Sequence, residues 1–119
     1  MSERVIEFSD KSLPVTQRRL AEIADVVVEG DPHHTSKLCF ENDSGDFKAG
    51  VWTSTPGKWR AFTDRDEYCF IVSGHVRLIG DDGTIQNFKT GDGFLIPNGF
   101  LGYWEVVETT TKHFVIRSY

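Results

Sequence analysis

The chain has 119 residues, which suits a single domain with one hydrophobic core. Apolar residues make up 39% of it and include nine Phe, three Trp and three Tyr, a composition typical of soluble globular proteins and unlike that of disordered chains. The net charge of −5, with no basic cluster denser than Arg18-Arg19, argues against a nucleic-acid partner. No apolar run reaches the roughly 18–20 residues of a membrane span, so we expect no membrane partner either.

The beginning of the chain and its cysteines indicate the compartment. The sequence MSERVIEFSD carries charges where a signal peptide has its apolar core, so we expect a cytoplasmic protein. Cys39 and Cys69 are the two cysteines, and neither belongs to a CxxC pair. We therefore expect two free thiols rather than a disulfide.

Residues 1–35 differ in pattern from the rest and are predicted to form an N-terminal arm. Arg4–Phe8 could make a short edge strand, and Gln17–Asp25 has apolar residues at the spacing of one or two helical turns. Val26–Val28 would then begin an extended segment that ends before Pro32. We expect this arm to wrap the barrel or a neighbouring subunit.

From residue 36 to 119 the pattern becomes one of short strands separated by turn residues. Pro56-Gly57 and Asp82-Gly83 are turn dipeptides, the second typical of a type I′ hairpin, and Ser73-Gly74 predicts a bend. The expected strands are Lys37–Glu41, Phe47–Thr53, Trp59–Thr63, Glu67–Val72, His75–Ile79, Thr84–Lys89, Phe94–Ile96, Phe100–Val107 and Lys112–Arg117. Strands this short and this regularly spaced indicate an all-β sandwich or barrel, here over residues 36–119 of a single domain.

The strand Glu67–Val72 is apolar on both of its faces. Glu67, Cys69 and Ile71 share one face, and the residues between them, Tyr68, Phe70 and Val72, share the other. A strand with one wetted face should alternate apolar with polar residues. Both faces are therefore expected to be covered, the outer one by the N-terminal arm, a second sheet or another subunit, and of these we predict a homodimer.

Two spacings in the middle of the chain resemble the two halves of the cupin motif, G-x5-H-x-H-x3–4-E-x6-G and G-x5-P-x-G-x2-H-x3-N. Glu67 precedes Gly74 by the spacing of the first half, and Gly91, Pro97 and Gly99 reproduce the second. The sequences GVWTSTPGKWRAF, DEYCFIVSGHVRL and GDGFLIPNGFLGYWEVVE are similar to the small single-domain cupins grouped with the (S)-ureidoglycine aminohydrolase cupin domain and the ethanolamine-utilisation cupin. The resemblance covers roughly Lys37–Arg117. It implies an all-β double-stranded β-helix, or jelly-roll, usually dimeric and with a ligand pocket in one barrel mouth.

The histidines that bind the metal in this family are missing. Depending on whether three or four residues intervene before Glu67, the H-x-H positions fall on Ala61 and Thr63 or on Arg60 and Phe62; the second-motif histidine and asparagine fall on Gly102 and Val106. Only Glu67 matches, and one carboxylate is not a metal site. We expect no metal ligands and no cofactor.

If Glu67 points inward as in cupins, the resemblance and the two-residue period of strands predict a ligand-binding lumen lined by Trp52, Trp59, Arg60 or Thr63, Glu67, Cys69 and Trp104. Glu67 is the candidate general acid or base, because an apolar surrounding could raise its pKa. Structural alternatives stay open for each of these residues. Glu67 and Arg60 could be a buried ion pair, Cys69 a small core residue and the tryptophans simply core.

The histidines do not replace the missing ligands. His33 and His34 are neighbours, so in an extended chain they point to opposite sides. They are expected in a solvated loop.

Three functions remain. The first is a metal-free cupin that binds a small molecule in its lumen, either as a binding module or as an enzyme. The second is a metal-dependent cupin enzyme acting on a ureido or related nitrogen compound, as the resemblance suggests. The third is an accessory or structural dimeric subunit. Loss of activity with EDTA would favour the second, and an open polar pocket would favour the first over the third.

Overall fold

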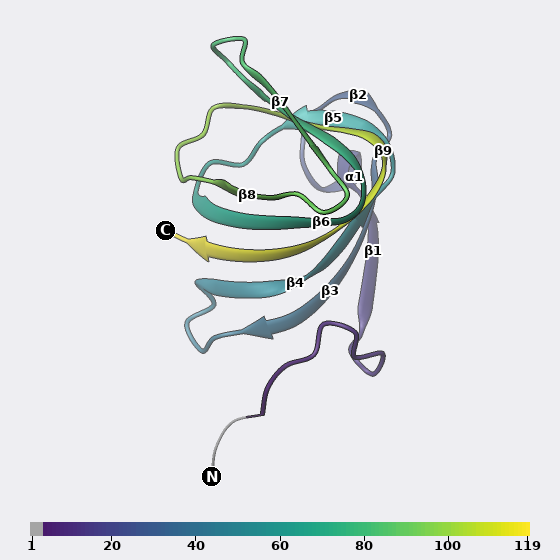
Figure 1. The fold of residues 1–119 in the computed structure, drawn as a ribbon, viewed down its shortest axis with the longest axis vertical. Helices are drawn as coiled ribbons and strands as arrows, with labels where there is room; N and C mark the ends of the chain where they lie inside the picture. Colours follow the sequence, from purple (N-terminus) through teal and green to yellow (C-terminus); the bar gives the residue numbers. More distant parts are fainter. Residues whose placement is uncertain (1–3) are drawn as a thin grey trace.

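A curled antiparallel sheet dominates the computed structural model, which describes residues 4–119 (Figure 1). The only helix among these residues is the single turn α1 (Leu20–Ile23). The strands are β1 (Val15–Arg19), β2 (Val27–Gly30), β3 (His33–Glu41), β4 (Phe47–Ser54), β5 (Gly57–Arg60), β6 (Arg65–Gly80), β7 (Ile85–Lys89), β8 (Gly93–Ile96) and β9 (Gly102–Ser118).

Two long strands, β6 and β9, form the spine of the sheet and run side by side from Arg65↔Ser118 to Gly80↔Gly102. β9 pairs with β4 along its C-terminal half and with β5 along its N-terminal half. β6 likewise pairs first with β8 and then with β7. One strand can serve two neighbours on the same edge because it bends between them, and the bends curl the sheet around a concave face (Figure 1).

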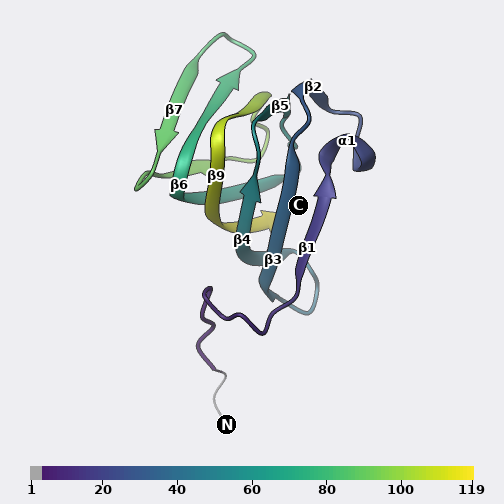
Figure 2. The same cartoon turned by 90° about the vertical axis from the view of Figure 1, so that its right-hand side faces the viewer.

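The N-terminal segment adds strands to this sheet. β1 pairs with β3 and β2 pairs with β5, so the order along the main path is β1-β3-β4-β9-β5-β2. Figure 2 shows β1, β3, β4, β9 and β6 side by side. The part of the predicted arm that forms β1 and β2 therefore lies at the two ends of this path through the sheet.

The concave face carries the core. Its buried members include Trp52, Trp59, Cys69, Ile71 and Trp104, with Phe94 and Phe114 packed against them. Alternate residues of each strand face the same side, which is why these positions are spaced by two within β6. Cys69 and Cys39 are free, as expected.

Several local predictions were wrong. Arg4–Phe8 is not a strand. The segment Gln17–Asp25 does contain one helical turn, but this turn begins only at Leu20 because β1 continues to Arg19. The pairs of strands expected on either side of Ser73-Gly74 and of residues 108–111 are single strands, β6 and β9. The Asp82-Gly83 hairpin exists, but only Gly83 has positive φ, whereas a type I′ turn needs positive φ at both central residues.

His33 and His34 belong to β3 rather than to a loop. Within residues 4–119, no helix has the length and hydropathy needed to cross a membrane.

Candidate functional site

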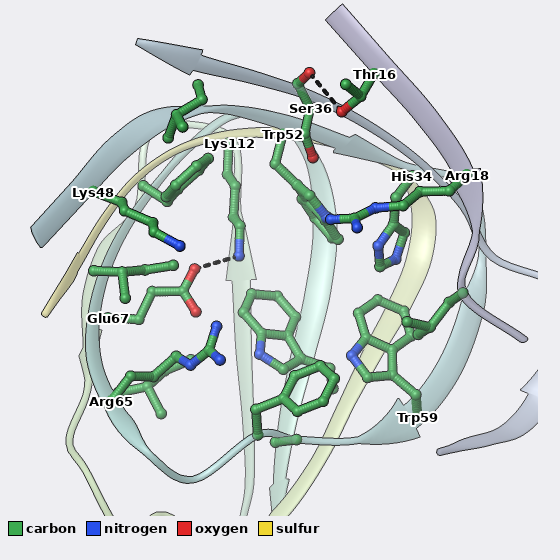
Figure 3. A pocket seen from close by; sticks show the side chains of 18 of the residues that line it. Thr16, Arg18, His34, Ser36, Lys48, Trp52, Trp59, Arg65, Glu67 and Lys112 are labelled. Carbon is green, nitrogen blue, oxygen red and sulfur yellow. Dashed lines mark hydrogen bonds and ion pairs between the residues drawn. The ribbon is translucent and has the colours of Figure 1, made fainter. Parts of the chain in front are cut away.

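The concave face of the sheet borders an open cavity of about 660 Å³, within the size range of small-molecule sites. Its walls come from β1, β3, β4, β5, β6, β8 and β9, with Ala61 and Phe62 from the connection after β5. Each strand contributes every second residue because the others point away from the lumen. Residues far apart in the sequence therefore meet around one space (Figure 3).

All three tryptophans of the chain line this cavity. Trp59 and Trp104 face each other across β5 and β9 with nearly parallel rings 6.2 Å apart, and Trp52 is tilted against both. The rings are almost fully buried, so their orientation is fixed by packing. They provide a rigid aromatic wall, in which Trp59 and Trp104 are nearly parallel and Trp52 is inclined to both.

A buried ion pair lies beside the tryptophans. Lys112 Nζ donates a hydrogen bond of 2.7 Å to Glu67 Oε2, and both side chains are about nine-tenths buried or more. The same ammonium lies 4.4 Å from the ring centre of Trp52 and 4.2 Å from that of Trp104 (Figure 3). A buried cation needs such partners, since removal from water is otherwise costly.

The thiol of Cys69 completes this group behind the carboxylate and donates to Glu67 Oε2 over 3.4 Å. Burial raises the pKa of Cys69 to about 12, so the thiol is neutral and a poor nucleophile. Burial opposes the charge on Lys112, but the hydrogen-bonded Glu67 carboxylate outweighs this, and the pKa of Lys112 lies above its usual value. Lys112 is therefore a fixed cation.

His34 lies against two of the tryptophans, with its ring centre 5.0 Å from that of Trp52 and 5.1 Å from that of Trp59. Its Nε2 is buried and has no hydrogen-bond partner among residues 4–119. Burial, reinforced by the charges of Lys112 and Arg18, lowers the pKa of His34 to about 4. The imidazole is thus neutral near pH 7.

The residues predicted for the lumen separate into three groups. Trp52, Trp59, Glu67 and Trp104 line the cavity. Cys69 faces inward but lies behind Glu67 and does not line it. Arg60 and Thr63 do not line the cavity either.

Arg60 points away because it pairs with Asp81, to which its Nη2 donates over 2.7 Å. Its neighbours on the wall are Ala61 and Phe62, one from each of the two alternative H-x-H registers. The ion pair between Glu67 and Arg60 that the sequence left open does not form, since Glu67 pairs with Lys112 and Arg60 pairs with Asp81.

The residues of the lumen do not fit a catalytic metal. No group of three His, Cys, Asp or Glu side chains within residues 4–119 is placed to hold one. The carboxylate at the motif position is engaged by Lys112. At Gly102, where the second-motif histidine would stand, even a Cβ would come within 2.1 Å of the Ile79 carbonyl oxygen, so a side chain has no room there.

Sequence reasoning missed Lys112, His34 and the further cations of the wall, which are Arg18, Lys48 and Arg65. The burial of Lys112 could have been predicted from the sequence, because Lys112 shares its strand face with Phe114 and Ile116. A lysine on an otherwise apolar strand face is expected to be buried and paired. His34 gave no comparable signal, since its strand had been predicted to begin three residues later.

Residues 41–114, more than half of the sequence, match the family model described as the EutQ-like cupin domain. The chain belongs to this family. Both motif halves of this cupin lie within the matched residues. No curated protein is significantly similar to it in sequence.

Solved structures confirm the jelly-roll cupin fold. A protein of unknown function from Pseudomonas syringae pv. tomato is 21% identical with a TM-score of 0.76, over 90% of this chain and 46% of that one. The Clostridium difficile EutQ protein is 18% identical with a TM-score of 0.65, over 73% of this chain and 64% of that one. Ectoine synthase from P. lautus is 12% identical with a TM-score of 0.63, over 85% and 76%.

Identities this low show the fold alone. This cupin spans about half to two thirds of the length of the first two of these proteins. The findings do not confirm the finer grouping with the (S)-ureidoglycine aminohydrolase cupins, which stays a prediction.

Proposed function

We propose that this cupin binds a small molecule in its lumen without the help of a metal ion. The observation that carries the proposal is the cavity of about 660 Å³, whose wall combines three ordered indole rings with the buried Lys112–Glu67 pair. Apolar walls with a few fixed polar groups are the usual composition of small-molecule sites. Independence from metal is supported by the side chains of the lumen, since within residues 4–119 no three His, Cys, Asp or Glu side chains are placed to hold an ion.

The buried ammonium of Lys112 prepares the lumen for a ligand. In cupins that hold a metal, the glutamate of the first motif half is a ligand; here the Lys112 ammonium bonds to the carboxylate at that position. The ammonium fixes the carboxylate and supplies a positive charge at the base of the lumen. Polar groups held in place before the ligand arrives make binding less costly in entropy.

The chain offers its own reporters for the test. All three tryptophans line the cavity, so their indole N–H signals in a ¹H–¹⁵N correlation spectrum report on the lumen and on little else. A fragment library should contain compounds that shift these signals in a saturable manner. The apparent affinity should be unchanged by EDTA.

A pair of substitutions on β3 locates the binding. Ser36→Phe fills the cavity, because Ser36 lines it, whereas Thr35→Phe places the same ring on the opposite face of the strand. Binding should be lost in the first variant and kept in the second. Equal binding in both variants would contradict a lumen site, and loss of binding in EDTA would favour a metal-dependent cupin.

A further inference from the structure

The wall of the cavity carries a strong excess of positive charge. Four cationic side chains line it, each from a different strand: Arg18 from β1, Lys48 from β4, Arg65 from β6 and Lys112 from β9. Glu67 is the one acidic residue among the described residues that line it, and His34 is neutral near pH 7. The cavity is thus cationic although the whole chain has a net charge of −5.

Lys112 and Glu67 neutralise each other, which leaves three cations on the wall. Arg65 donates to Asp64 through its Nε over 3.0 Å. The two terminal nitrogens of the Arg65 guanidinium are not used in this ion pair and can bind a ligand (Figure 3). Glu41 is 3.7 Å from Lys48 Nζ, a long ion pair between two side chains that are each about two-fifths exposed. Neither Asp64 nor Glu41 lines the cavity.

Arg18 has no ion-pair partner in the described part of the chain. Its neighbour Arg19, on the other face of β1, pairs with both Asp31 and Glu22. Figure 3 shows the guanidinium groups of Arg18 and Arg65 and the ammonium of Lys48 all directed into the cavity. Cations that line one cavity repel one another, and an anion bound in the cavity relieves that repulsion.

The part of the wall across from Lys48 and Arg65 is aromatic (Figure 3). It consists of the three indole rings, with Phe62 and Phe114 beside them. Stacking against such a wall favours a ligand whose body is aromatic or otherwise flat and apolar. A ligand that satisfies both walls carries its negative charge at one end and an apolar body at the other.

We infer that the ligand of this lumen is a small organic anion, a carboxylate or phosphate monoester, whose charged end lies at Arg65 and Lys48 and whose apolar body lies on the tryptophans, on the side of the cavity where Figure 3 shows Arg18. This inference rests on the proposed function, because it names the class of ligand for the same cavity. Arginine suits this role because its planar fork matches two oxygens of a carboxylate or phosphate at once.

The test uses probes that share a phenyl ring and differ in the group it carries and in charge. Phenylacetate, phenyl phosphate and the neutral phenylacetamide are titrated into the protein by calorimetry at low ionic strength, with the indole N–H signals as the record of where they bind. Charge-assisted hydrogen bonds should make at least one anion bind about tenfold or more tightly than the amide. The advantage should shrink as salt is added, because added ions screen partly exposed charges.

Matched variants assign the effect to the wall. Arg65→Gln and Lys48→Gln should each weaken binding of the preferred anion by about tenfold while leaving phenylacetamide binding unchanged. Arg117→Gln is the control. It removes the same charge from the strand next to Arg65, where Arg117 pairs with Asp66 in the sheet register but lies outside the cavity. It should leave both affinities unchanged.

The outcomes separate the two proposals. If phenylacetamide shifts the indole signals as readily as the anions do, the lumen binds small molecules but the anion inference is overturned. Equal weakening by Arg117→Gln and Arg65→Gln overturns it as well, because the effect is then one of net charge. If neither these probes nor the fragment library shifts the signals, both proposals fail. Preference for phenyl phosphate over phenylacetate, or the reverse, assigns the charged group.

Discussion

Lys112 is the residue on which the interior of this cupin depends most. Its ammonium is buried with the Glu67 carboxylate and two indole rings, and together they replace the water that the charge has lost. A buried ion pair adds little net stability compared with apolar residues of the same shape, but removing one member leaves the other charge buried without a partner. The pair is thus a vulnerable point in the core.

We predict that Lys112→Met lowers the free energy of unfolding by about 3–5 kcal/mol, because Glu67 is left without its cation. Glu67→Gln should also destabilise the protein, yet the double variant should lose at least about 1 kcal/mol less than the two single losses together. Urea denaturation of the four proteins measures this coupling. Strict additivity would mean that the two groups do not depend on each other.

His34 makes stability depend on pH. Its folded-state pKa of about 4 lies below the ordinary value of 6.5, so the unfolded chain takes up the proton first as the pH falls. This contribution to stability is complete above pH 6.5 and is lost between pH 6.5 and pH 4. We expect it to amount to about 1–2 kcal/mol, since the ring is only partly buried.

In His34→Gln the side chain no longer titrates, so the loss of unfolding free energy between neutral and acid pH should be smaller by this amount. Urea denaturation across this range measures it for both proteins. His33→Gln is the control, because His33 is exposed on the other face of β3. A pH dependence unchanged in His34→Gln would show that other groups cause it.

The site was partly predictable from single residues. The motif spacing and the two-residue period of strands were enough to place Glu67 and Trp104 on the wall. The same period did not decide whether Arg60 points into the lumen or away from it. Its partner Asp81 lies 21 residues further along the chain, and no local sequence pattern predicts that pairing. Arg18, Lys48 and Arg65 meet only through the curl of the sheet, which requires the strand order, so their convergence could not be seen in the sequence.

Most strands were predictable from the sequence, but not the fact that two long bent strands, β6 and β9, each take the place of two expected short ones. β6 was expected to stop at Ser73-Gly74, because such residues usually end a strand; instead the strand bends there and goes on. The register shifts between Ile71 and Val76 mark the bend. The bend lets β6 pair with β8 before it and with β7 after it.

Gly74 makes this bend possible. Its φ of +118° is disfavoured for other residues, and a Cβ there would lie 2.3 Å from Thr110 Oγ1, which is itself held by hydrogen bonds to His75 and Glu108. Gly74→Ala should therefore lower the free energy of unfolding by more than about 3 kcal/mol. Gly83 also has positive φ but open space around it, so Gly83→Ala should cost only about 1 kcal/mol. Thermal or urea unfolding compares the two, and equal losses would show that crowding at Gly74 is relieved by movement of β9.

At the scale of the whole molecule, the outer face of the sheet is apolar where a soluble chain would be expected to be polar. One row of paired residues crosses five strands and consists of Leu95, Tyr68, Val115, Ala49 and Phe40. At the usual strand spacing the row is about 19 Å long. Leu95, Tyr68 and Phe40 are 61%, 45% and 38% exposed, whereas the small Ala49 between its larger neighbours is only 7% exposed. The chain therefore leaves the large side chains of the row uncovered.

We propose that a second copy of the chain covers this row and makes the protein a homodimer. A twofold axis through Val115 would bring Leu95 of one copy to Phe40 of the other and would match the large Tyr68 with the small Ala49. The row is thus complementary to itself, as an isologous interface requires.

Sedimentation equilibrium should give twice the chain mass of 13.5 kDa. Replacing Tyr68 and Leu95 together with Arg should give folded monomers, whereas Ile85→Arg, at an equally exposed apolar position on β7, should leave the dimer intact. A wild-type mass of 13.5 kDa would contradict the proposal, and dissociation by Ile85→Arg would place the interface elsewhere.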